Sequence, residues 1–268
     1  MTPPILTDRA ALARHRARAT AFFLQEEARD EIQERLTEVN RTFTAPVVVS
    51  GFPALWPDFL VVADDETLDL HEGAHDLVIH ALALHWANDP VGQLVQCRRA
   101  LRPDGLFLGL MFGGQTLHEL RACLAEAEVE VTGGLSPRVL PMGEIRDLGA
   151  LLQRAGFALP VADSYTKTVL YRDALHLMAD LRAMGEGNAL MARLRRPTRR
   201  AVLARAMALY HDRFATADGR IPATFEVIAL TGWAPHDSQQ KPLRPGSAAT
   251  RLAEALHAAE RPLPRENG

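Results

Sequence analysis

The sequence predicts one large α/β domain with a doubly wound, mostly parallel sheet, and three observations support this. The chain has 268 residues, of which 47% are hydrophobic and 24% charged, which suits a single extended core. Short apolar runs alternate along the chain with segments of helical periodicity. These runs are nearly continuous instead of alternating with polar residues, which is typical of strands that are buried on both faces.

The first hundred residues contain the clearest alternation. Residues 7–39 carry apolar side chains at helical spacing and are predicted to be helical, with Thr7 as the N-cap. Three short apolar runs follow and are predicted as strands, each ended by a turn or by acidic residues. They are Val47–Val49, Phe59–Val62 and the run that begins at Asp76. A helix is then expected over residues 88–101, before the Arg102–Gly105 break.

The remaining chain alternates in the same way. Further strands are expected at Leu106–Phe112, Ala158–Asp163 and Ala223–Thr231, and helices at Thr116–Val131, Ile145–Ala155, 172–194 and 198–214. We therefore divide the chain into a helical arm (1–42), an α/β domain (43–232) with a helical insertion (172–214), and a tail (233–268) whose last dozen residues are expected to be loosely ordered.

Composition excludes several classes of protein. No window approaches 18 consecutive apolar residues, so a membrane-spanning helix is not expected. The N-terminus lacks a charged segment followed by an apolar one, so no secretory signal is expected. Only Cys97 and Cys123 are present, which excludes a disulfide framework and predicts a reducing compartment. The net charge of −3 argues against a general nucleic-acid binder.

The most specific stretch is 75–112. A strand begins at Asp76 and runs into a loop that holds His85 and Trp86; a helix and a Pro-Asp-Gly turn then lead to the next strand. This stretch resembles the fourth and fifth strands of class I S-adenosylmethionine-dependent methyltransferases. The resemblance implies a Rossmann-like methyltransferase fold with added helices at the N-terminus and between the late strands.

Several later segments narrow the resemblance to the respiratory complex I assembly factor 5 family. The segments are Met111–Arg121, Gly133–Pro137, Asp147–Gly149, Arg154–Phe157, Met184–Asn188, Ile221–Glu226, Gly232–Trp233 and Arg244–Ala248. Members of that family have a methyltransferase-like fold and are associated with hydroxylating an arginine of one complex I subunit. The malonyl-acyl-carrier methyltransferases of biotin synthesis share the sheet pattern but are not expected to share the C-terminal signature.

The chain departs from the methyltransferase pattern at the first strand. An acid and a Gly-x-Gly-x-Gly turn are expected there, but residues 48–54 contain only Gly51, with valine at the position of the acid. Only Phe52–Asp58 separates this strand from the next, which is too short for a crossover helix. We therefore expect a sheet of about six strands and weak or lost binding of S-adenosylmethionine.

Site residues follow from the resemblance and from their position at the carboxyl ends of strands. The cofactor side comprises Gly51, Asp64, Asp65, His85 and Trp86, and the substrate side comprises Asn88, Asp89, Gly113 and Gly114. A solvated turn at the two aspartates and simple packing at the histidine and tryptophan are the alternative interpretations. No catalytic residue is assigned. A metal site is not expected, because alternate positions of a strand face opposite sides and so separate neighbouring histidines.

Two classes of function stay open. The first is a methyltransferase-like enzyme that acts on a protein substrate in complex I assembly, by methyl transfer or by arginine hydroxylation. The second is a non-catalytic pseudo-methyltransferase that binds an assembly intermediate. In either case we expect a cytoplasmic bacterial protein with no nucleic-acid partner, which reaches the inner face of the inner membrane only through its partner.

Overall fold

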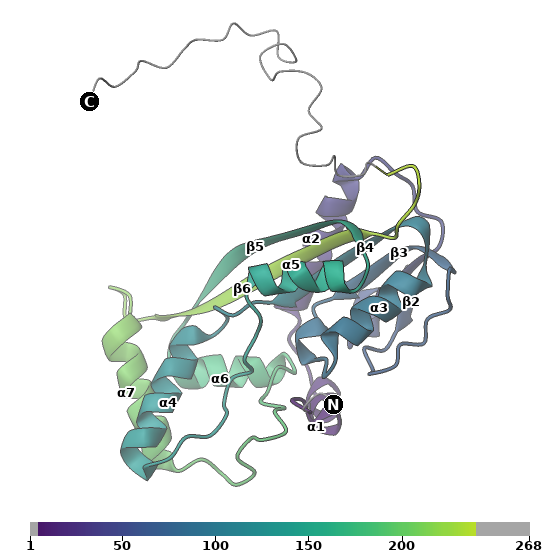
Figure 1. Ribbon diagram of the computed structural model, residues 1–268. Helices are drawn as coiled ribbons and strands as arrows, with labels where there is room; N and C mark the ends of the chain where they lie inside the picture. The colour runs from purple at the N-terminus through teal and green to yellow at the C-terminus, as the bar shows by residue number, and fades with distance from the viewer. Residues whose placement is uncertain (1–4, 240–268) are drawn as a thin grey trace, which may run out of the picture. The chain divides into compact units, whose positions relative to one another are not determined.

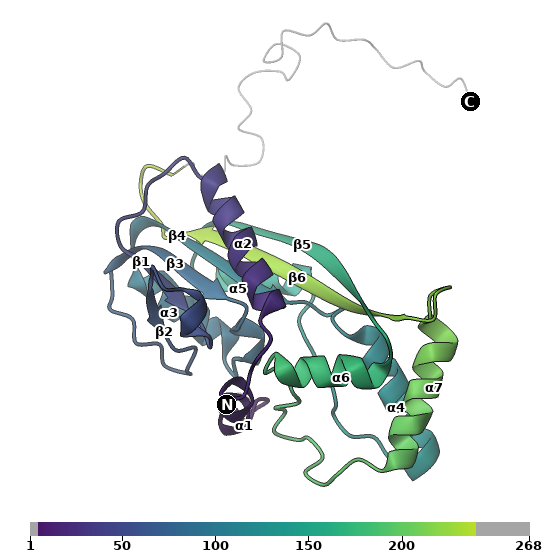
Figure 2. The ribbon, with the colours of Figure 1, turned by 180° about the vertical axis from the view of Figure 1, so that it is seen from behind.

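A computed structural model describes residues 5–239 of the chain. Contacts divide the chain into two units, Met1–Pro235 and His236–Gly268, and the described helices and strands all lie in the first. The expected Arg244–Ala248 signature and the end of the expected tail lie outside the described residues. Six strands of the first unit form one mixed sheet in the order β2-β1-β3-β4-β6-β5, as Figures 1 and 2 show from opposite sides.

Parallel and antiparallel strands occupy different halves of this sheet. The strands are β1 (Pro46–Val49), β2 (Leu60–Val62), β3 (His75–Ala81), β4 (Leu101–Phe112), β5 (Ala158–Tyr171) and β6 (Ile221–Trp233). The first four are mutually parallel, whereas β6 runs antiparallel to both β4 and β5. The carboxyl ends of β1, β2, β3 and β4 therefore point to the same side, where ligands bind in sheets of this kind.

The helices cover both faces of the sheet. They are α1 (Arg9–Arg16), α2 (Phe23–Glu38), α3 (Pro90–Ala100), α4 (His118–Thr132), α5 (Ile145–Arg154), α6 (Ala174–Ala183) and α7 (Arg200–Phe214). Helix α2 lies on one face, whereas α3 and α5 lie on the other (Figures 1 and 2). Helices α4, α6 and α7 gather beyond the end of β4, near the start of β6 (Figure 1).

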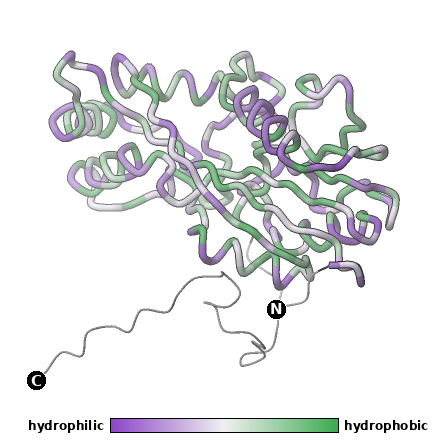
Figure 3. The backbone as a smooth tube through the Cα atoms, turned by 90° about the horizontal axis from the view of Figure 1, so that it is seen from above, coloured by the Kyte–Doolittle hydropathy of each residue, from purple (hydrophilic) through white to green (hydrophobic). Residues whose placement is uncertain are grey.

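The two faces belong to two separate hydrophobic clusters. Val48 and Ile79 pack in the cluster that includes α2. Val47, Val49 and Val78 pack in the cluster that includes α3 and α5. Successive side chains of a strand point to opposite faces, so both faces of a central strand must be apolar. Figure 3 shows hydrophobic and hydrophilic stretches alternating along the backbone.

The predicted contraction of the sheet is confirmed. The connection from β1 to β2 contains only the three-residue 3-10 helix Pro53–Leu55, yet the two strands pair in parallel. Pro53 opens that helix and Pro57 follows it, so neither residue can donate a backbone hydrogen bond to extend an α-helix. The sheet has six strands as a result.

Several predicted element boundaries are wrong. The expected helix over 7–39 is broken between α1 and α2, because the amides of Thr20 and Ala21 both donate to the carbonyl of Ala183. The N-cap of α1 is Asp8, which accepts from the Ala11 amide at 3.0 Å. The expected helix over 172–194 ends at Ala183, two residues before Gly185, which has a φ of +79°.

The late strands are longer than predicted. Strand β5 continues to Tyr171 instead of ending near Asp163, because β6 pairs with it along nearly its whole length. Strand β4 begins at Leu101, but its Arg102–Gly105 segment pairs with neither β3 nor β6, and Asp104 has a φ of +63°. Long-range pairing has therefore extended β5, whereas the predicted break persists in β4 as an irregularity ahead of its paired residues.

Candidate functional site

The structure divides the predicted cofactor-side residues: Gly51, Asp64 and Asp65 line one small cleft, whereas Trp86 lines a different and larger pocket. Gly51 follows β1, Asp64 and Asp65 follow β2, and His85 and Trp86 lie in the 3-10 helix Leu84–Trp86 after β3. Helix α1 contributes the side chains of Arg9 and Arg16 to the small cleft. The outcome is a cleft whose contents differ from those that the sequence predicts.

Arg16 lies directly over the glycine. A Cβ atom built on Gly51 would lie 2.3 Å from Nη1 and 2.5 Å from Cζ of this arginine. The Phe52 ring lies 5.6 Å from the same Cζ, which places the guanidinium within cation–π range. Gly51 is therefore needed for the close approach of an arginine of the same chain.

Asp64 is the anchor of that arginine. Its side chain is 4% exposed, and its Oδ1 accepts from Arg16 Nη1 at 2.6 Å. Arg9 Nη1 lies 3.3 Å from Oδ2. Burial by itself raises the pKa of Asp64, but the two guanidinium groups outweigh burial and hold the pKa below its usual range. The carboxylate is therefore charged, and both of its oxygens are occupied.

Asp65 differs from its neighbour in burial. Its side chain is 73% exposed, and within residues 5–239 its one ion pair is a 3.6 Å contact with Arg9. An exposed pair of this length contributes little to stability. The small pocket between these groups has a volume of about 380 Å³ and is bounded by α1 and by the turns after β1 and β2.

The residues present do not fit S-adenosylmethionine as the methyltransferase pattern would hold it. The single glycine is covered by the Arg16 guanidinium, and the buried carboxylate is engaged with Arg16 and Arg9. A pocket of about 380 Å³ is near the lower end of the range for small-molecule sites. No step of a reaction is therefore assigned to this cofactor.

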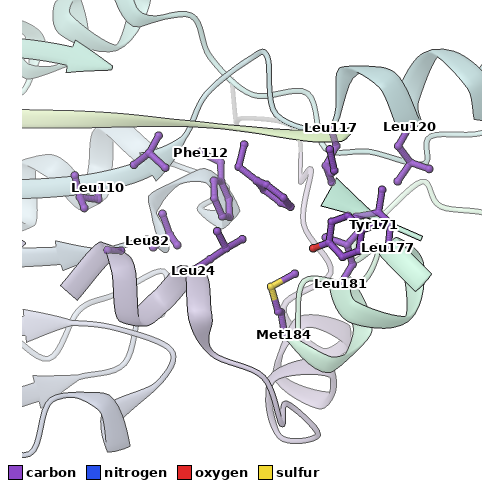
Figure 4. Packing of buried hydrophobic residues seen from close by; sticks show 14 of the residues in the cluster. Leu24, Leu82, Leu110, Phe112, Leu117, Leu120, Tyr171, Leu177, Leu181 and Met184 are labelled. Atoms are coloured by element: carbon purple, nitrogen blue, oxygen red, sulfur yellow. The ribbon is translucent and has the colours of Figure 1, made fainter. Parts of the chain in front are cut away.

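A second and larger pocket of about 950 Å³ lies among α4, α6, α7 and the end of β4. Its wall is mostly apolar and includes Phe112, Leu117, Leu120 and Leu181, which Figure 4 shows converging from these elements. Pockets of this size and lining accept ligands that are themselves largely apolar and carry few polar groups. The few polar groups of this pocket therefore decide its specificity.

Glu186 supplies the most unusual of those polar groups. Its side chain is 9% exposed, and its Oε2 accepts from the indole Nε1 of Trp86 at 2.8 Å. Its Oε1 is buried and has no hydrogen-bond partner among the described residues. His85 Nε2 is likewise unpartnered and lies 3.8 Å from Oε2. A buried acceptor without a donor is costly and signals a missing partner.

Three arginines also line the large pocket. Arg138 is fully engaged, because it donates to both carboxylate oxygens of Glu128 and to the Thr198 hydroxyl. Arg18 and Arg182 are exposed, and neither forms a side-chain hydrogen bond or ion pair with a residue of 5–239. The positive charge that is open to a ligand is therefore carried by these two.

The predicted substrate-side residues lie outside the wall of this pocket. Asn88 Oδ1 accepts from the amides of Leu6 and Thr7 and so fastens the N-terminal segment. Asp89 is the N-cap of α3 and accepts from the Gly92 amide at 2.8 Å. Both have structural partners in this fold.

The two glycines of the substrate side are explained by close packing. A Cβ at Gly113 would lie 2.5 Å from Oε2 of Glu226, and a Cβ at Gly114 would lie 2.5 Å from Oε1 of Glu144.

Sequence reasoning missed Arg16 and Glu186 as site residues. The quoted Met184–Asn188 segment contained the glutamate, and the crowded basic residues of the N-terminal arm contained the arginine.

The buried residues His80, Cys97 and Cys123 have surroundings that favour a packing role over a chemical one. No group of three His, Cys, Asp or Glu side chains within residues 5–239 is arranged to hold a metal ion. Burial lowers the pKa of His80 to about 4, so this side chain is neutral, and its Nε2 pairs with Oε1 of Gln93. Burial raises the pKa of both Cys97 and Cys123, which makes them poor nucleophiles.

No helix within the described part of the chain is long and apolar enough to cross a membrane.

Comparison with known proteins agrees with the fold. The model of the methyltransferase domain family matches residues 8–109. The crystal structure of the YcgJ protein from Bacillus subtilis superposes with a TM-score of 0.50 at 11% identity, covering 78% of this chain and 99% of that one. At this identity the likeness concerns the fold alone.

Relatives found by sequence share a higher identity with this chain than that solved structure does. Arginine-hydroxylase NDUFAF5, mitochondrial, of Danio rerio is 41% identical over 226 residues, covering 84% of this chain and 69% of that protein. The protein of the same name from Homo sapiens is 42% identical, and the chain spans 57% of its length. A malonyl-[acyl-carrier protein] O-methyltransferase of Laribacter hongkongensis is 37% identical over 70% of this chain and 60% of its own length. The chain belongs to the NDUFAF5 family, on a class I methyltransferase fold.

Proposed function

We propose that this chain binds an arginine-bearing segment of a protein partner in its 950 Å³ pocket during the assembly of respiratory complex I, and that it does so without methyl transfer. Relatives with 41% and 42% identity carry the name arginine-hydroxylase, which supports arginine as the recognised side chain. The observation that carries the proposal is the buried, unpartnered Oε1 of Glu186 in the pocket wall.

A guanidinium group is the partner that this oxygen fits best. A carboxylate that is 9% exposed is costly to bury alone, and a cation that bonds to it offsets that cost. Arginine donates from a planar fork and is more weakly hydrated than lysine, so it enters apolar surroundings more readily. Because Trp86 already donates to Oε2, Oε1 remains for the ligand.

The remaining wall would position the segment around that arginine. The rings of Trp86 and Phe112 line the pocket and offer faces over which a guanidinium stacks favourably. Leucines of α4 and α6 would take apolar neighbours of the arginine and exclude water, which strengthens the ionic contact. Exposed Arg18 and Arg182 favour an acidic residue of the partner near the entrance.

Hydroxylation of the bound arginine is the second candidate, favoured by the name of the relatives. The chain's own residues would contribute the holding and orienting of the guanidinium in either case, and pure binding makes the chain a pseudo-methyltransferase. We place the protein in a bacterial cytoplasm, at the inner face of the inner membrane through its partner. The relatives are named mitochondrial, which supports a site of action where complex I is built.

The test uses overlapping synthetic peptides of the complex I subunits of the source bacterium. We expect the bound peptides to contain arginine, and replacement of that arginine by uncharged, nearly isosteric citrulline to weaken binding by about 30-fold or more, since one partner of a buried charge pair is lost. Glu186→Gln should weaken binding of the arginine peptide similarly, because its amide still accepts from Trp86 but has no charge. Equal binding of the citrulline peptide would refute recognition by charge.

Mass spectrometry of the bound subunit in cells separates the activities. A gained oxygen on the arginine supports hydroxylation, an unmodified arginine supports pure binding, and a gained methyl group contradicts the proposal. Calorimetry with S-adenosylhomocysteine should show no binding at millimolar ligand, because Arg16 and Asp64 occupy the cleft. Micromolar binding would overturn this part of the proposal.

A further inference from the structure

Arg16 is buried with three of its five N–H donors, those of Nε and Nη2, without an acceptor among the described residues. Its side chain is 8% exposed, and Nη1 donates to Asp64 at 2.6 Å. The Nε and Nη2 groups form one edge of the guanidinium, the edge that binds a carboxylate or phosphate through two parallel hydrogen bonds.

The protein itself does not supply the missing acceptor. Both oxygens of Asp64 are taken, Oδ1 by Arg16 Nη1 and Oδ2 by Arg9. The Asp65 side chain is largely exposed, and among the described residues its carboxylate forms an ion pair with Arg9 and with no other cation. Unmade hydrogen bonds on a buried cation are expensive, and a group of this kind in a native fold signals an unseen acceptor.

The small pocket of about 380 Å³ offers the space for that acceptor. Arg16 lines it together with Arg9, Ser50 and Gly51. The Ser50 hydroxyl oxygen accepts from the Phe52 amide, which leaves its own O–H to donate. Among the buried and half-buried charges at this edge, two arginines face one aspartate, so the local balance favours an anion.

We propose that this pocket binds a small oxyanion, held side-on by Nε and Nη2 of Arg16 and supported by Ser50. The chemistry is that of a carboxylate or a phosphate, both of which present two oxygens at the spacing of the guanidinium edge. The site is separate from the arginine-binding pocket, whose named polar groups are Trp86 and Glu186. The proposal also goes beyond the methyltransferase pattern, in which a glycine-rich turn holds a nucleoside cofactor.

The test titrates the full chain with malonate, acetate and inorganic phosphate at constant ionic strength, with chloride as the reference, by thermal shift and calorimetry. We expect saturable stabilisation by at least one of the first three and none by chloride. Arg16→Lys should weaken the affinity tenfold or more, because lysine keeps a charge for Asp64 but lacks the two-pronged edge. Arg14→Lys is the matched control, since Arg14 is exposed on the same helix, and its affinity should match the wild type within twofold.

Three results would overturn the proposal. They are the absence of saturable binding by every anion, an unchanged affinity in Arg16→Lys, and an equal loss in Arg14→Lys. In the first case buried water satisfies the arginine. The result is independent of the arginine-binding function, because Glu186→Gln should leave the anion affinity unchanged and Arg16→Lys should leave peptide affinity unchanged.

A pair of nucleosides distinguishes the source of the oxyanion. S-adenosylhomocysteine and 5′-methylthioadenosine share an adenosyl thioether, but only the first has a carboxylate. We expect neither nucleoside to bind at millimolar concentration while a small anion does, which identifies a free oxyanion as the ligand. Binding of the first nucleoside alone, lost in Arg16→Lys, would keep the oxyanion site but overturn the exclusion of the nucleoside. Equal binding of both, without binding of the small anions, would overturn the oxyanion site.

Discussion

The two ends of the sheet differ in the length of their strands and in the polarity of the pocket beside them. At the β1–β2 edge the strands have four and three residues, the crossover is a three-residue 3-10 helix, and two arginines around one aspartate line a small pocket of about 380 Å³. At the other end β4, β5 and β6 have 12, 14 and 13 residues, and with α4, α6 and α7 they surround an apolar pocket of about 950 Å³. The difference teaches that one methyltransferase-like fold can combine a contracted, charge-rich sheet edge with a large apolar pocket at its other end.

The largest expected effect comes from removing the centre of that charge cluster. Asp64→Ala leaves Arg16, which is 8% exposed, and Arg9 without their common partner. We expect a loss of about 3–5 kcal/mol in the free energy of unfolding, because an uncompensated buried charge remains. Urea unfolding measures this loss, and Asp65→Ala is the matched control, with an expected change within about 0.5 kcal/mol at this exposed side chain.

The pH dependence of the same pair sharpens the comparison. The folded pKa of Asp64 lies below its usual range, so its contribution is fully present above the ordinary pKa of an aspartate and is lost as the pH falls through the folded value. The difference between wild type and Asp64→Ala should therefore shrink only in strong acid. A difference that shrank near neutral pH would contradict a charged carboxylate as the anchor.

A change at His80 tests the hydrogen bonds that support the backbone of Asp64 and Asp65. Its Nε2 pairs with Gln93, whose own amide donates to the backbone carbonyls of Asp64 and Asp65. Burial lowers its pKa from 6.5 to about 4, so below pH 6.5 the unfolded chain binds a proton that the folded chain does not. Stability should thus fall by about 3 kcal/mol as the pH drops from about 6.5 to 4.

Urea unfolding across this pH range checks the contribution of His80. His80→Gln should flatten the pH dependence by that amount, whatever its effect on stability at neutral pH. His71→Gln, at an exposed position, should keep the wild-type slope. If both variants kept that slope, another group would be responsible for the acid sensitivity.

Sequence reasoning reached the contraction of the sheet but not its consequence. The short β1–β2 connection could be predicted because two prolines and seven residues allow no crossover helix, a constraint that is local in sequence. The Arg16–Asp64 pair joins residues 48 apart, and the break between α1 and α2 depends on the carbonyl of Ala183. Neither contact has a periodic or compositional signal. The importance of Glu186 lies in a missing hydrogen bond, which only the assembled pocket defines.

The substitution with the smallest expected effect tests whether the glycine at position 51 is required by the packing of Arg16 or by the backbone turn after β1. Gly51→Ala places a Cβ 2.3 Å from the present position of Arg16 Nη1, so the guanidinium must leave Asp64 or the backbone must shift. We expect a loss of about 1–3 kcal/mol. Gly134→Ala is the control, because its Cβ would meet no heavy atom closer than 3.9 Å.

The double-mutant cycle with Arg16→Ala gives the decisive comparison for this glycine. Once the guanidinium is removed, the added methyl group has room, so Gly51→Ala should cost less than about 0.5 kcal/mol in the Arg16→Ala background, and the two changes should be strongly non-additive. Additive losses would mean that the glycine is required by the backbone turn after β1. In that event the close approach of Arg16 would be incidental, and the charge cluster could not be the reason for a glycine at this position.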